Sequence, residues 1–216
     1  MDDARVASWF FEKKAELIIK KMEKKGFAAH YAATAEGAGK AVLAMIPEGA
    51  AVILTGSQTL EQIGVKPHLR DSGKYNLIDP YEPGITPAEG LARRKKGLLA
   101  DVMVSSSNAL TEDGVLVNVD GMGNRVAGMI FGPDKVILAL GMNKVVKDLP
   151  EAYSRLSRIA GPMNNKRLES KNPCAETGFC HDCQGKTRIC NYFTRIERSF
   201  IEGRIAVILI GQDLGY

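Results

Sequence analysis

The sequence predicts an α/β fold, built on an open and mainly parallel sheet with helices on both faces. Continuous apolar runs at 51–55 (AVILT), 135–140 (KVILAL) and 206–210 (AVILI) are typical of strands that are covered on both faces. Segments of helical periodicity alternate with such runs, as expected of βαβ connections. The 216 residues are 45% hydrophobic and 25% charged, which suits a single domain, 1–216, with a sizeable core.

The chain is expected to begin with a helix over 1–26, because one apolar stripe has a spacing of three or four residues: Ala4, Ala7, Phe11, Ala15, Ile18 and Met22. Gly26 is the expected stop of this helix. The next elements are predicted in this order: strand 27–32, helix 34–45 with Thr34 as N-cap, strand 51–55, a helix from about 57, strand 75–78, helix 87–100, strands 101–105, 115–119 and 135–140, helix 149–160 and strand 206–210.

Charge and hydropathy exclude several classes of protein. The net charge of +4 is too small to indicate nucleic-acid binding. No apolar run reaches the ~20 residues of a membrane span, and the charged N-terminus does not resemble a signal peptide, so we expect a cytoplasmic protein without membrane contact. The region 155–204 holds ten Lys/Arg against five Asp/Glu, which favours an anionic ligand or an acidic partner over a neutral one, although a solvated face would look the same.

The first polar loop follows the strand at 51–55. Gly56 permits a tight turn, while Ser57 and Thr59 place hydroxyl groups at the start of the next helix. The free N–H groups of a helix N-terminus attract phosphate or carboxylate groups. We therefore predict that these three residues bind an anion, with a simple N-cap as the alternative.

The second polar loop follows the strand at 101–105 and is rich in amides and charges. Its predicted ligand-binding residues are Asn108, Asp120, Asn124 and Arg125, since an arginine can bind a carboxylate with two hydrogen bonds. Glu112 is the candidate catalytic carboxylate, as a base or a nucleophile. Turn and cap roles are the alternative for each of these residues.

All four cysteines fall within seventeen residues, in the Cys-rich segment 171–192 that precedes the last strand. Their pattern is C-x5-C-x2-C-x6-C, and the members are Cys174, Cys180, Cys183 and Cys190. Four thiolates suffice for a tetrahedral zinc or an iron–sulfur cluster, and disulfides are unfavourable in a cytoplasmic protein. Either metal is predicted, with reduced structural thiols as the alternative. His181 lies inside the segment and is an alternative ligand.

Several of these stretches resemble the lactate-utilisation (LUD) domain family, whose members include lactate-utilisation protein C. The similarity is most specific in 106–133 (SSNALTEDGVLVNVDGMGNRVAGMIFGP), 161–168 (GPMNNKRL), the Cys-rich segment and 204–216 (RIAVILIGQDLGY). It implies membership of a superfamily with ribose-5-phosphate isomerase, sugar-phosphate deaminases and CoA-transferases, and hence a Rossmann-like sheet. The segment around Glu112 is similar to the one that carries the nucleophilic Glu of CoA-transferases, with Asp113 where those enzymes have Asn.

The resemblance implies an accessory role in oxidising L-lactate, or a similar 2-hydroxy acid, to pyruvate together with iron–sulfur partner proteins. No flavin or nicotinamide motif is present, because no G-x-G-x-x-G opens a βαβ unit. The ligand would be a small anionic metabolite: lactate, pyruvate, a sugar phosphate or an acyl-CoA. One alternative is a stand-alone transferase or isomerase that uses Glu112, and another is an electron-transfer or interaction module built on the cysteines. The sequence is compatible with a homo-oligomer.

Overall fold

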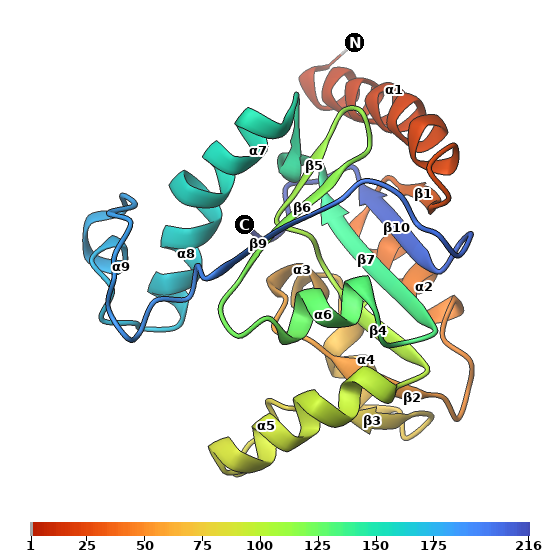
Figure 1. Cartoon of the computed structure of the whole chain (residues 1–216). Helices are drawn as coiled ribbons and strands as arrows, with labels where there is room; N and C mark the ends of the chain where they lie inside the picture. Colours follow the sequence, from red (N-terminus) through yellow and green to blue (C-terminus); the bar gives the residue numbers. More distant parts are fainter. Residues whose placement is uncertain (1) are drawn as a thin grey trace.

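Six parallel strands form the central sheet of the protein (Figure 1). The computed structural model describes residues 2–216. From one edge to the other the strands are β1 (Ala28–Ala32), β10 (Ile205–Ile210), β7 (Lys135–Gly141), β4 (Val102–Ser105), β2 (Ala51–Leu54) and β3 (Asn76–Ile78). All five neighbouring pairs run parallel. The predicted α/β class is confirmed.

Both faces of this sheet are covered, which explains why its central strands are apolar throughout. On one face the core is formed with α2 (Ala35–Ala44), α3 (Gln58–Gln62) and α4 (Val65–Asp71). On the other face it is formed with α1 (Asp3–Glu23) and α6 (Asn124–Ile130), together with a second sheet. The helix α5 (Pro87–Lys96) and the short 3-10 turn after it pack near β3 and β2.

The second sheet has four short strands and was not predicted. Its order is β8 (Val145–Val146), β5 (Ala109–Thr111), β6 (Leu116–Asp120) and β9 (Tyr192–Ile196). The strand expected at 115–119 therefore exists as β6, but it lies between two antiparallel neighbours outside the central sheet. One of these neighbours, β9, comes from a distant part of the chain.

The helix expected over 149–160 extends further. It runs as α7 (Leu149–Arg155), a π-helical turn (Leu156–Ala160) and α8 (Gly161–Arg167). Pro162 lies two residues after the π turn and lacks the N–H that a regular helix would use there. The chain then forms the four-residue helix α9 (Cys174–Thr177) and an irregular loop that leads into β9.

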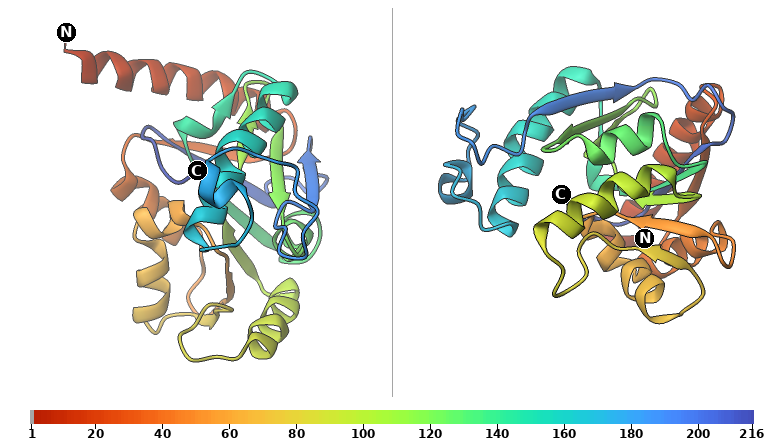
Figure 2. Two further views of the ribbon diagram at one scale, coloured as in Figure 1. Left: turned by 90° about the vertical axis from the view of Figure 1, so that its left-hand side faces the viewer. Right: turned by 60° about the horizontal axis from the view of Figure 1, so that its bottom comes forward.

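Only the second half of α1 packs on the body of the protein. Ala15, Ile18 and Met22 are buried, as their spacing predicts, whereas the earlier stripe positions Ala4 and Ala7 are exposed. In the left view of Figure 2 the N-terminal part of α1 projects beyond the rest of the fold. No helix in the described part of the chain is long and apolar enough to cross a membrane.

The turn after α1 gives a testable consequence at Gly26. Its φ is +81°, and a Cβ there would lie 2.5 Å from the carbonyl oxygen of Ser199. Gly49 has nearly the same φ, +80°, with open space around it. We expect Gly26→Ala to lower the free energy of unfolding by about 2–4 kcal/mol and Gly49→Ala by only about 1–2 kcal/mol, because the second variant has the backbone strain without the clash. Urea unfolding measures both, and equal losses would contradict the packing argument.

Candidate functional site

A polar cavity of about 830 Å³ opens at the carboxyl ends of four neighbouring strands. Its walls include the residues that directly follow β2 and β4, together with Tyr81 after β3 and Lys144 after β7. The chain leaves β2 for β3 on one side and then returns to β4 on the other side. Such a reversal of direction opens a crevice at the end of a parallel sheet, where α/β proteins bind ligands.

The loop after β2 supplies one wall of the cavity. Gly56 and Ser57 both line it, and a Cβ at Gly56 would lie 3.0 Å from the Tyr81 hydroxyl, so a larger residue there would fit only if Tyr81 moved slightly. The Ser57 hydroxyl accepts a hydrogen bond from the N–H of Leu60 at 3.3 Å and thereby caps α3. Thr59 is fully buried behind this wall and is not a lining residue.

The most unusual group in the cavity is the ammonium of Lys144, a residue that is only 3% exposed. It donates hydrogen bonds to the hydroxyls of Thr59 (2.9 Å) and Ser106 (3.0 Å). One of its three donors thus remains for a ligand. Burial, followed by the charges of Arg155 and Arg125, lowers the pKa of Lys144 from 10.5 to about 7. Within residues 2–216 no carboxylate forms an ion pair with it.

The cavity wall is strongly cationic. Its two acids are both paired, Glu61 with Lys66 at 3.3 Å and Asp120 with Arg125 at 3.3 Å. Seven lining residues are basic: Lys66, Arg94, Arg125, Lys144, Arg167, Lys186 and Arg188. A concave, positively charged surface of this kind concentrates anions.

Arg125 lines the cavity, but protein groups occupy its donors. One terminal nitrogen donates to the Ser106 carbonyl (3.0 Å) and Asn118 Oδ1 (2.7 Å). The other donates to Asn108 Oδ1 (2.9 Å) and the Val119 carbonyl (2.8 Å), while Nε faces Asp120. Arg125 therefore holds the loops after β4 and β6 together. The direct ligand contact that the sequence predicts for Arg125 stays a prediction, since the residue lines the cavity while its donors contact protein groups.

The structure brings most of the predicted binding residues to this one cavity. The lining residues among them are Gly56, Ser57, Asn108, Asp120, Asn124 and Arg125, and Thr59 contacts the lining Lys144. Glu112 is not among the lining residues. It is 42% exposed at its side chain and forms an ion pair with Lys14 of α1 at 2.7 Å.

Apart from Arg125, sequence reasoning missed the basic residues that give the cavity its charge. Lys144 could have been found, because it follows the buried strand at 135–140 and the ends of parallel strands converge. Arg94 of α5 lies over the ring of Tyr81, 4.9 Å from its centroid, in a contact between a helix and a loop that no local pattern indicates. Arg167, Lys186 and Arg188 come from the basic region 155–204, whose bias had suggested an anionic ligand.

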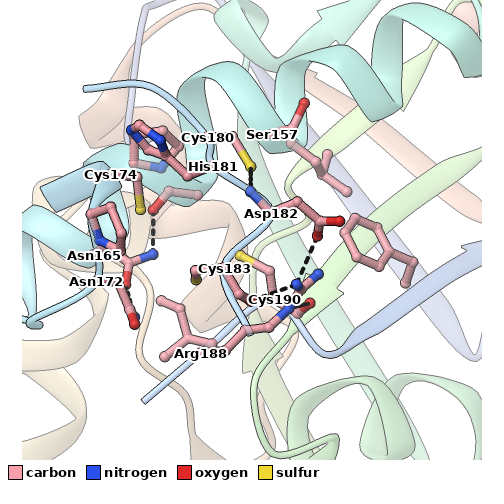
Figure 3. Close-up of a pocket in the computed structure, with 16 residues that line it drawn as sticks. Ser157, Asn165, Asn172, Cys174, Cys180, His181, Asp182, Cys183, Arg188 and Cys190 are labelled. Atoms are coloured by element: carbon pink, nitrogen blue, oxygen red, sulfur yellow. Dashed lines mark hydrogen bonds and ion pairs between the residues drawn. The ribbon is translucent and has the colours of Figure 1, made fainter. Parts of the chain in front are cut away.

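A second cavity, of about 230 Å³, lies beside the first and is lined by all four cysteines (Figure 3). The remaining wall comes from the π turn, α8, the Cys-rich segment itself and Phe193 of β9. All four thiols are free. Burial and the neighbouring thiols raise the pKa of Cys190 to about 11, and the same causes raise the pKa of Cys174.

The two cavities share part of their walls. Gly161, Arg188, Ile189 and Cys190 line both. In residues 2–216, no three His, Cys, Asp or Glu side chains gather closely enough to hold a single metal ion. His181 lines the cysteine cavity, with Nε2 2.9 Å from the Thr177 hydroxyl.

Comparison with known sequence families identifies the domain. The LUD domain matches residues 15–210, which is most of the chain and includes all residues that line the two cavities except Tyr216. The chain belongs to the LUD domain family. This family suggests a function related to lactate utilisation. A search among curated proteins finds no significant match.

Solved structures are similar to this LUD domain in fold. A crystal structure of a DUF162 family protein from Deinococcus radiodurans has a TM-score of 0.50 and 14% identity, and the alignment covers 93% of this chain and 98% of that one. Ribose 5-phosphate isomerase A from Methanocaldococcus jannaschii has a TM-score of 0.35 and 14% identity, with 60% of this chain and 66% of that one covered.

Proposed function

We propose that this LUD domain binds a small anionic metabolite in the polar cavity, as an accessory protein in the utilisation of L-lactate or a similar 2-hydroxy acid. Oxidation to pyruvate would take place together with iron–sulfur partner proteins. The family supports the metabolic role. The binding proposal rests on the burial of the Lys144 ammonium without a carboxylate partner. A buried ammonium without a carboxylate partner is costly, and an anion that enters the cavity would supply the missing charge.

The basic residues that line the cavity have different roles in binding. Lys144 offers its free donor at the base of the cavity, beside the hydroxyls of Thr59 and Ser106. Arg94 and Arg167 line other parts of the same cavity and form no ion pair within the described chain. Arg125 and Asp120 keep the loop around Asn124 in place. A carboxylate or phosphate would thus meet several donors that are already positioned.

The volume of the polar cavity is large enough for anions that are bigger than lactate. About 830 Å³ is several times the volume of a three-carbon acid and lies within the usual range of metabolite pockets. A sugar phosphate or an acyl-CoA would fill more of it, which supports the alternative of a stand-alone transferase or isomerase. Because Glu112 is not part of the wall, our proposal leaves it out of the chemistry.

Calorimetric titration with L-lactate, pyruvate, ribose 5-phosphate and acetyl-CoA tests the proposal. We expect at least one of them to bind with a Kd below 1 mM, on the order of −4 kcal/mol or better. Lys144→Met should weaken that binding by roughly tenfold or more, the effect of losing one charge-assisted hydrogen bond.

Lys147→Met is the matched control, since Lys147 lies in the same segment but is exposed and outside the cavity. Its affinity should equal that of the wild type. If none of the four anions binds, or if both variants lose affinity equally, the cavity does not have the proposed role.

A further inference from the structure

The Cys-rich segment is held in place although it has almost no regular structure. Asn165 and Asn172, both 2% exposed, connect it to α8, with Asn172 Nδ2 donating to Asn165 Oδ1 at 2.7 Å and to the Thr187 carbonyl at 2.8 Å. The Thr187 hydroxyl donates back to Asn172 Oδ1 at 2.7 Å. Buried amides with complete partners fix one conformation. The cysteines therefore have defined positions around their cavity.

Arg188 fixes the second half of the segment. Its guanidinium donates to the carbonyls of Cys183 (2.7 Å) and Cys190 (2.9 Å) and pairs with Asp182 at 2.7 Å. A single arginine thus joins the backbone at two of the four cysteines and places a positive charge beside them. That charge would offset the negative charge of metal-bound thiolates.

The turn Cys180–Cys183 has a further feature of thiolate–metal sites. The N–H of Asp182 points to Cys180 Sγ at 3.5 Å, as the dashed line in Figure 3 shows. Asp182 has a φ of +45°, which is unusual for a residue other than glycine and marks a tight turn of the backbone between the two cysteines. Hydrogen bonds to cysteine sulfurs stabilise metal-bound thiolates and tune iron–sulfur clusters.

The arrangement of the thiols favours a cluster over a single zinc ion. Four sulfurs around one zinc lie about 3.8 Å apart, given a Zn–S distance of about 2.3 Å and tetrahedral angles. In the described chain no three such side chains gather around one point, yet all four line one cavity of about 230 Å³. In a four-iron cluster each thiolate binds a different iron, so the sulfurs stand apart around a central body.

We propose that Cys174, Cys180, Cys183 and Cys190 bind an iron–sulfur cluster of the [4Fe–4S] type in this cavity. Cys190 and Arg188 also line the polar cavity, so the cluster would lie directly behind the wall of the anion site. This inference goes beyond the proposed function and does not depend on it, because it rests on residues of the second cavity.

The test is anaerobic purification of the full chain, followed by reconstitution with ferrous iron and sulfide. We expect a brown protein with about four iron and about four sulfide per chain, and an electron paramagnetic resonance signal after reduction with dithionite. Cys183→Ser should lose most of the iron and sulfide. Ser157→Ala, at another lining residue of the same cavity, and Lys144→Met, in the polar cavity, should both keep the cluster.

The wild-type analysis decides the question even if Cys183→Ser does not fold, which circular dichroism will show. One zinc per chain without sulfide would overturn the proposal, and so would a metal-free protein with four titratable thiols after reconstitution. A Cys183→Ser variant that is folded and keeps the full cluster would also overturn it. Lys144→Met changes the polar cavity and leaves the cysteines intact. The result for the cluster therefore stands even if no anion binds to the polar cavity.

Discussion

Replacing Arg125 with methionine is expected to destabilise the protein by about 3–5 kcal/mol, because it removes one member of a buried ion pair and leaves several acceptors without donors. The carboxylate of Asp120 would lose the guanidinium at 3.3 Å, and the carbonyls of Ser106 and Val119 would lose their side-chain donors. Urea unfolding at neutral pH measures the loss. Arg125→Lys should recover little, since one ammonium cannot reach all of these acceptors.

Two comparisons show whether the network is the cause. Arg195→Met, which breaks the exposed pair between Arg195 of β9 and Glu197 after it, should cost less than about 1 kcal/mol. Adding Asp120→Asn to Arg125→Met should recover part of the stability, because the unpaired buried carboxylate is then gone. A loss at Arg125 as small as the one at Arg195 would contradict our interpretation of the network.

Lys144→Met is expected to have the opposite effect on stability and to abolish a pH dependence of binding. The pKa of Lys144 is about 7 in the folded protein and 10.5 in the unfolded chain, so the unfolded chain holds more protons between these values. Wild-type stability should therefore rise with pH across this window. At pH values below about 7 the buried ammonium of Lys144 destabilises the fold. Lys144→Met should therefore be more stable than the wild type there by roughly 1–3 kcal/mol, and this gain should disappear near pH 10.

Binding of an anion favours the charged form of Lys144 and raises its pKa. Affinity for a carboxylate should thus fall by up to about tenfold per pH unit above pH 7, with proton uptake on binding. Titrations in buffers of different ionisation enthalpy measure that uptake. In Lys144→Met both the slope and the uptake should be absent. A wild-type affinity that is constant from pH 6 to pH 9 would contradict the role given to this lysine.

The sequence predicted the central sheet well because its signals are local. The apolar strand at 51–55 and the polar residues Gly56 and Ser57 after it occupy consecutive positions, and the rule for parallel sheets then places them at a cavity. The second sheet was not predicted because β5 and β8 are only three and two residues long. Their pairing depends on tertiary contacts that propensity does not encode.

The sequence predicted where the candidate site lies better than it predicted which side chains are free to contact a ligand. The amides and charges of 105–125 do converge, but residue type alone could not show that protein acceptors saturate Arg125. The position of Lys144 after a buried strand indicated its place near the cavity, but not its burial, which is a property of the fold and not of the local pattern. The relation of the cysteines to the anion site likewise depends on how α8 and β9 bring 174–190 back to the sheet.

Gly161 stands where the two cavities meet, and this has a consequence for how they communicate. A Cβ there would lie 3.0 Å from the Leu156 carbonyl oxygen and 3.5 Å from Cys190 Sγ. Gly161 thus brings the backbone of the wall that both cavities share close to one of the four thiols. Charge that accumulates on one side will be screened only weakly from the other. A ligand that binds in one cavity, or an oxidation in it, should thus change the electrostatic potential in the other cavity. No movement of the chain is needed for this effect.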